Sequence, residues 1–120
     1  MASDMQIISY LEAGIKTESA RQTAIASNIA NLNTPGYKRV EVKFNEVLAD
    51  KIGSDKDLES GDEGIELFSP MDTQPRDDGN DVSLDNEVGE MVENSLKHKT
   101  YTRILAMKYR QIDLATNFNK

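Results

Sequence analysis

The sequence predicts a mainly α-helical protein in which two long terminal helices form an antiparallel helical hairpin or coiled coil. Two observations lead to this prediction. Apolar residues recur at spacings of three and four near both ends of the chain, and glycine, proline and acidic residues gather between them. We therefore expect one structural unit with a core helix in residues 1–33, a turn and acidic loop or β segment in 34–80, and a second core helix in 81–120.

The first helix is expected to run from about Asp4 to Leu32, with Ser3 or Asp4 as its N-cap. Its apolar residues form a narrow stripe that keeps heptad register through two polar positions. The stripe fits a small helix bundle and a coiled-coil partner equally well, and Gly14 either lets a neighbouring helix approach or weakens this one. The residues of the stripe are Ile8, Leu11, Ile15, Ile25, Ile29 and Leu32.

A strong stop signal follows this helix. Pro35 has no amide proton and disfavours the α conformation at Thr34, so the helix should end by about Asn33. The Pro-Gly pair favours a turn in which Gly36 takes a positive φ. Three asparagines crowd the last helical turns, where their side chains compete for backbone groups. The spacing alone would indicate an ordinary helix stop.

The middle of the chain is expected to be rich in loops. Residues alternate between apolar and polar through Tyr37–Leu48, which indicates an extended segment or one strand. The apolar island Ile65–Phe68 can pair with Val40–Phe44 as a short β-hairpin. The remainder of Ala49–Pro75 is acidic and poor in apolar residues, which predicts a solvated loop or conditional disorder.

The second helix is expected to run from about Leu84 to Thr116, after a turn at 76–80 and a cap at Asp81 or Ser83. Its apolar stripe is interrupted by polar residues at heptad positions, as in the first helix. Neither stripe is wide enough for independent stability, so we expect neighbouring copies to supply much of the stabilisation. The apolar residues of this stripe are Val88, Met91, Leu105, Tyr109 and Ile112.

Composition excludes several classes of function. The 120 residues carry a net charge of −7, and no basic patch is present that could neutralise the phosphates of a nucleic acid. There is no cysteine and only one histidine, His98, so we expect no zinc site, no cofactor and no enzyme activity. The acidic residues do not fit the calcium-loop template, which leaves weak cation binding beside a simple solvated loop.

The chain has no apolar run long enough to span a bilayer and no recognisable signal peptide. By itself this would indicate a cytoplasmic protein. One hypothesis consistent with these features is an acidic cytoplasmic helical adaptor or chaperone-like binding protein, folded as a monomer or dimer.

Two stretches point elsewhere. Residues Ser27 to Lys38 read Ser-Asn-Ile-Ala-Asn-Leu-Asn-Thr-Pro-Gly-Tyr-Lys, which resembles the N-terminal signature of the flagellar axial protein family. That family comprises the rod, hook and hook-associated subunits of the bacterial flagellum. The run from Asp78 to Glu87, followed by Asn94, Ser95, Leu96 and Tyr101, is similar to the segment that leads into the C-terminal helix of proximal rod members.

The resemblance implies a structural subunit of the proximal rod of the basal body, located in the periplasmic space. Such subunits leave through the flagellar type III export system without a cleaved signal peptide, and assemble helically into the drive shaft that transmits motor torque. The implied partners are copies of the chain, other proximal rod proteins, the hook–basal-body adaptor protein at the membrane ring, and the export gate. We expect a group of residues to set the angle of the turn. They are Asn28, Asn31, Thr34, Pro35, Gly36 and Tyr37.

Overall fold

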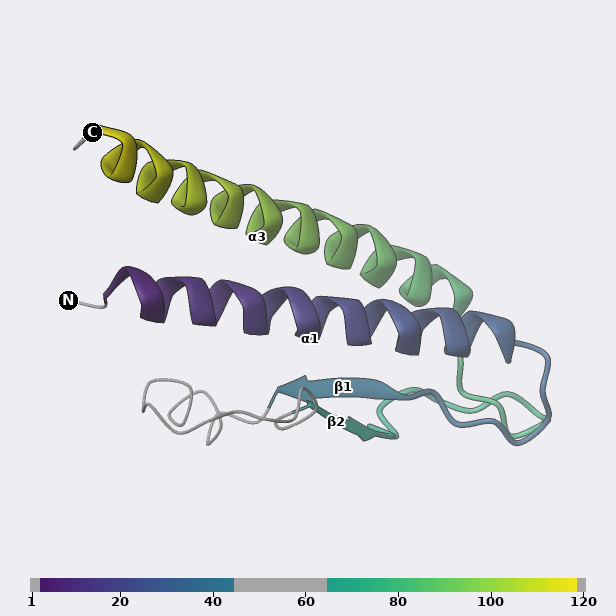
Figure 1. Ribbon diagram of the computed structural model, residues 1–120. Helices are drawn as coiled ribbons and strands as arrows, with labels where there is room; N and C mark the ends of the chain where they lie inside the picture. Colours follow the sequence, from purple (N-terminus) through teal and green to yellow (C-terminus); the bar gives the residue numbers. More distant parts are fainter. Residues whose placement is uncertain (1–2, 45–64, 119–120) are drawn as a thin grey trace.

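The computed structural model describes residues 3–44 and 65–118 (Figure 1). In chain order these residues form helix α1 (Asp4–Ala30), strands β1 (Glu41–Phe44) and β2 (Ile65–Phe68), and helix α3 (Leu84–Phe118). The two helices lie side by side and run in opposite directions, and the two strands lie alongside α1. This arrangement confirms the predicted fold class: a mainly helical hairpin whose middle segment contains a small antiparallel sheet.

Helix α1 begins and ends through side-chain capping. Ser3 is the N-cap: its Oγ accepts from the amide of Gln6 at 3.2 Å, while the Gln6 side chain accepts from the Ser3 amide at 3.0 Å. The helix ends at Ala30, two residues before the predicted end. The reason is Asn31, which leaves the helical conformation and donates its side-chain amide to the carbonyl of Ser27 at 2.8 Å.

The two strands pair antiparallel, with Val42 opposite Leu67 and Phe44 opposite Ile65. The predicted pairing of these two segments is therefore confirmed. Val42 is buried beneath α1, whereas its cross-strand partner Leu67 is 67% exposed. The segment that joins the strands, which includes most of the predicted acidic loop, lies outside the described residues.

The seam between α1 and α3 is largely polar. Polar contacts near both ends show that the two helices are antiparallel: Asn28 donates to Glu87 at 3.1 Å, and Asp4 pairs with Lys108 at 3.6 Å. Between them Gly14 lies against an aromatic ring, since a Cβ there would lie 3.2 Å from the ring of Tyr101. Gly14 therefore allows close approach of the second helix. Apart from Glu90, the buried and half-buried positions of α3 keep heptad spacing: Glu87, Met91, Asn94, His98, Tyr101, Leu105 and Lys108.

The predicted stripe of α3 coincides only in part with this contact face. Met91 and Leu105 are half-buried, but Val88, Tyr109 and Ile112 are 46%, 48% and 37% exposed in the isolated chain. Ile112 lies beyond the start of α1, because α3 is the longer helix and Lys108 is already opposite Asp4. The predicted residues of α1 are buried (Ile8, Ile25) or half-buried (Leu11, Ile15, Ile29, Leu32).

Candidate functional site

The turn after α1 packs against the segment that leads into α3. We refer to this contact between residues 27–39 and 76–87 as the junction, which lies at the end of the hairpin away from the termini (Figure 1). Backbone hydrogen bonds join its two halves: the Gly36 amide donates to the Asp78 carbonyl at 2.8 Å, and the Asp81 amide donates to the Tyr37 carbonyl at 3.3 Å. Lys38 adds a side-chain bond from Nζ to the carbonyl of Gly79 at 2.7 Å.

Two glycines with positive φ meet at the centre of the junction. In the turn from Thr34 to Tyr37, Gly36 has a φ of 74°, as predicted, and the Tyr37 amide donates to the Thr34 carbonyl at 3.3 Å. Gly79 has a φ of 84°, and a Cβ placed on it would lie 3.5 Å from the Cα of Gly36. Glycine is the residue that adopts this conformation without strain, so the two turns can lie against each other.

Asn80 caps the end of α1 from the far side of the chain. Its side chain is fully buried, and Nδ2 donates to the carbonyls of Asn31 at 2.9 Å, Leu32 at 3.1 Å and Thr34 at 2.8 Å. The last carbonyls of a helix have no intrahelical donor, and the Asn80 side chain supplies one here. Its Oδ1 accepts from the amide of Val82 at 2.8 Å, so the same side chain also fixes the approach to α3.

Asn28 is equally saturated. Its Nδ2 donates to the Val40 carbonyl at 2.9 Å and to Glu87 Oε2 at 3.1 Å. Its Oδ1 accepts from the Val40 amide at 2.9 Å and from the Tyr37 hydroxyl at 3.1 Å. A primary amide has two donor hydrogens and two acceptor lone pairs, and all are used here. Asn28 thus ties α1, the turn and α3 together at one point.

A buried ion pair lies beside Asn28. Arg39 Nε donates to Glu87 Oε1 at 3.1 Å; Arg39 is 3% exposed and Glu87 is fully buried. The Arg39 amide donates to Asp81 Oδ1 at 2.6 Å, so this carboxylate holds the backbone of the turn instead of capping α3. Ser83 occupies the cap position, and its carbonyl accepts from the Glu87 amide at 3.0 Å.

Three further carboxylates surround the Arg39 guanidinium: Glu41 at 2.7 Å, Asp72 at 3.2 Å and Glu90 at 3.4 Å. Burial acts to lower the pKa of Arg39, but the hydrogen bonds and charges of Glu41 and Glu87 raise it overall. Burial raises the pKa of Glu90, and Arg39 opposes that shift. The cation is therefore firmly held, and the carboxylates around it exceed it in number.

The comparisons with known proteins agree with this arrangement. Residues 11–38, which end in the turn of the junction, match the family described as flagella basal body rod protein. Proteins named flagellar basal body rod protein FlgB are similar over most of the chain. The one from Borrelia hermsii is 29% identical over 118 residues, covering 80% of this chain and 84% of the relative. The one from Bacillus subtilis is 26% identical over 114 residues, covering 88% of each.

The chain therefore resembles the flagellar basal body rod protein family. Its members are structural proteins of the flagellum and not enzymes. The chaperone-like adaptor proposed from composition therefore gains no support from the comparisons. Within residues 3–44 and 65–118 there is no cluster of three or more acidic, histidine or cysteine side chains placed to hold a metal ion. No helix in those same ranges is both long enough and apolar enough to cross a membrane.

The residues expected to set the turn occupy distinct places in the junction. Asn28 and Tyr37 belong to the buried network, bonded to each other at 3.1 Å. Asn31 is the C-cap of α1, and its Oδ1 accepts from the hydroxyl of Thr34 at 3.1 Å. Pro35 and Gly36 form the exposed tip of the turn.

Sequence reasoning did not single out the partners of these residues. Arg39, Asn80 and Glu87 carry most of the buried hydrogen bonds of the junction, yet their roles depend on partners 46 to 59 positions away, as in the bond from Asn28 to Glu87. The available signal was the run from Asp78 to Glu87, which resembles other rod proteins and includes two of the three.

Proposed function

We propose that this chain is a structural subunit of the proximal rod of the flagellar basal body, assembled helically into the drive shaft that transmits motor torque. Similarity to proteins named flagellar basal body rod protein FlgB supports a place in the basal body. The finer features come from the resemblance: export by the flagellar type III system, residence in the periplasmic space, and contact with the hook–basal-body adaptor and the export gate.

The junction is the observation that carries the mechanical part of this proposal. A torque-bearing subunit needs a rigid element that fixes the relative directions of its helices and its middle segment. In this chain the buried pair Arg39–Glu87 and the saturated amides of Asn28 and Asn80 join both helices and the turn. Buried polar groups with all partners present specify one geometry, because any other arrangement leaves them unpaired. The junction would then set the exit angle of the middle segment.

The exposed apolar residues of α3 support assembly with neighbours. Val92, Leu96, Met107 and Leu114 are 58% to 66% exposed, and they lie within about 60° of one another around the helix. Lys99, Arg103 and Arg110 lie in the same sector, so this face of α3 is both apolar and basic. Exposed apolar residues grouped on one face are typical of interaction surfaces. In a rod they would be covered by neighbouring chains, together with Val88, Tyr109 and Ile112, which the isolated hairpin leaves exposed. A contact that repeats without closing on itself gives an extended assembly.

The experiment is complementation of a strain that lacks the gene for this chain. We expect Pro35→Ala combined with Gly36→Ala to abolish rod assembly and motility, because the turn loses its preset φ and its glycine conformation. Export of the subunit, measured by cell fractionation, should continue. Asn33→Ala is the matched control: Asn33 lies in the same turn, is exposed, and makes no side-chain hydrogen bond to the described residues. Normal motility of the double variant would contradict the proposed role of the turn.

A further inference from the structure

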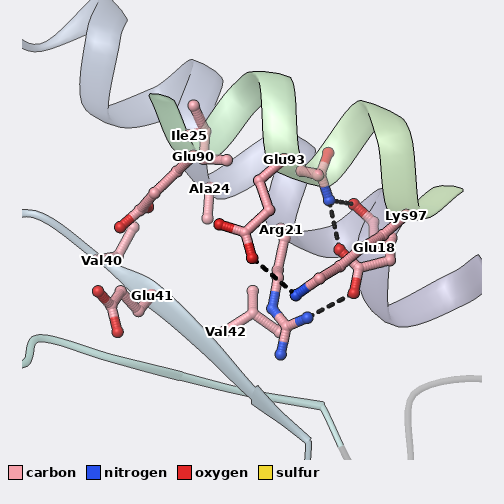
Figure 2. A pocket seen from close by; sticks show the side chains of 11 residues that line it. Glu18, Arg21, Ala24, Ile25, Val40, Glu41, Val42, Glu90, Glu93 and Lys97 are labelled. Carbon is pink, nitrogen blue, oxygen red and sulfur yellow. Dashed lines mark hydrogen bonds and ion pairs between the residues drawn. The ribbon is translucent and has the colours of Figure 1, made fainter. Parts of the chain in front are cut away.

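A hollow of about 260 Å³ lies between α1, α3 and β1, above the sheet (Figure 2). Its floor is apolar and includes Ala24, Ile25 and Val42. Four carboxylates and two cations surround the floor, and two of the carboxylates, Glu41 and Glu90, also pair with Arg39, which lies outside the lining. We refer to this feature as the acidic hollow, and its charged lining is Glu18, Glu41, Glu90, Glu93, Arg21 and Lys97.

A shallow groove lies on the opposite side of the same helix pair. It is lined from α1 by Ser19 and Gln22, and from α3 by residues that include Lys99, Thr102 and Arg103. On both helices these positions lie on the other side of the seam from the hollow, because each residue turns the helix by about 100°. The groove has two cationic side chains and no carboxylate in its lining. We refer to it as the basic groove.

The acidic hollow also contains an unmet hydrogen-bond acceptor. Asn94 lines it and is 3% exposed, and its Nδ2 donates to the Glu18 carbonyl and to Glu18 Oε2, both at 2.7 Å. Its Oδ1 is buried and has no hydrogen-bond partner among the described residues. A buried acceptor of this kind needs a donor. Lysine and arginine side chains carry only donors, and they would also offset the excess of carboxylates.

We propose that the acidic hollow of one copy binds the cationic side chains beside the basic groove of a second copy, with Lys99 and Arg103 facing Glu90 and Glu93. The hollow has more carboxylates than cations in its lining and the groove has cations without carboxylates, so their charges are complementary. The two features overlap along the helix pair, since residues 90–97 of α3 line the hollow and residues 95–103 line the groove. Because they lie on opposite sides of the seam, the contact is heterologous and can repeat from copy to copy in one direction. This inference rests on the proposed rod assembly and names the surfaces that copies use within it.

Cysteine cross-linking tests the contact, because the chain has no cysteine of its own. Lys97→Cys places a thiol in the acidic hollow and Thr102→Cys places one in the basic groove, and both leave the four facing charges intact. In basal bodies isolated from complemented cells, oxidation of this double variant should give a ladder of covalent dimers, trimers and larger species.

The matched control is Lys97→Cys with Thr100→Cys. Thr100 and Thr102 are both exposed, and each donates its hydroxyl to its own helix at 2.8 Å, but Thr100 lines neither feature. We expect at least a tenfold lower ladder yield from the control, and a similar loss when Lys99→Glu and Arg103→Glu are added to the first pair.

Three results would overturn the inference while leaving the proposed function standing. They are equal ladders from both pairs, no ladder from basal bodies that contain the chain, and cross-links only to a different rod protein. Absence of the parent chain from basal bodies would instead contradict the proposed function.

Discussion

The two ends of the hairpin differ in how they are held together. At the junction the polar side chains of Asn28, Asn80, Arg39 and Glu87 are buried and paired. Toward the termini the polar contacts between the helices are exposed pairs, Tyr109 with Glu12 and Lys108 with Asp4, and α3 extends past α1. Exposed pairs contribute little stability. We infer that the junction is complete within one chain, whereas the terminal ends of the helices need neighbours.

The largest expected effect comes from breaking the buried ion pair. Arg39→Ala leaves the carboxylate of Glu87 fully buried without its cation, which should lower the free energy of unfolding by about 3–5 kcal/mol. Arg110→Ala removes an exposed arginine of α3 and should change stability by less than about 0.5 kcal/mol. Urea unfolding followed by circular dichroism measures both. Equal effects of the two substitutions on stability would contradict the inference that the junction is held more firmly within one chain than the terminal ends are.

A pair of glycine substitutions should differ in sign. Gly79→Ala places a side chain at a φ of 84° and near the Cα of Gly36, which should destabilise the chain by about 1–2 kcal/mol. Gly89→Ala lies within α3 with open space around its Cβ, and should stabilise the chain by about 0.5–1 kcal/mol. Thermal unfolding of the two variants beside the parent chain gives the comparison. A stabilising Gly79→Ala would show that the two turns do not lie as described.

The smallest expected effect concerns the acidic surroundings of Arg39. Burial raises the pKa of Glu90. The charge of Arg39 opposes this upward shift, and the charges of Glu87 and Glu41 add to it. A carboxyl group with a raised folded-state pKa binds its proton more tightly in the folded chain. Its contribution to stability therefore falls as pH rises from the unfolded pKa through the folded pKa.

Glu90→Gln removes this dependence. The variant should have a slightly higher urea midpoint than the parent at pH 7, and the difference should shrink as the pH falls toward 4. A lower midpoint at pH 7 would mean that the pairing of Glu90 with Arg39 at 3.4 Å outweighs the burial of the carboxylate.

The sequence was sufficient for those features that depend on neighbouring residues. The Pro35-Gly36 turn, the alternation in β1 and the start of α3 all follow from local rules, and the structure has them where they were predicted. The end of α1 differed by two residues because the Asn31 side chain competes for a helix carbonyl. These signals lie within a few positions of the residues that they affect.

The orientation of α3 could not be predicted in the same way. The heptad pattern was read from apolar residues such as Val88 and Tyr109, but the helix turns Glu87 and Asn94 toward α1 instead. Those two side chains find partners in Asn28 and in Glu18, 59 and 76 positions away. Apolar periodicity contains no information on such pairings, because they depend on which polar groups the fold brings together.

Hydrogen exchange of the isolated chain, read residue by residue, tests the central difference most directly. We predict that the amides of Gly36, Arg39, Val40 and Asp81 exchange slowest, since they are bonded within the junction. Amides of α3 beyond Lys108 should exchange rapidly in the monomer and become protected only in assembled rods. Equal protection along both helices of the monomer would contradict the account, because the terminal ends would then be complete without neighbours.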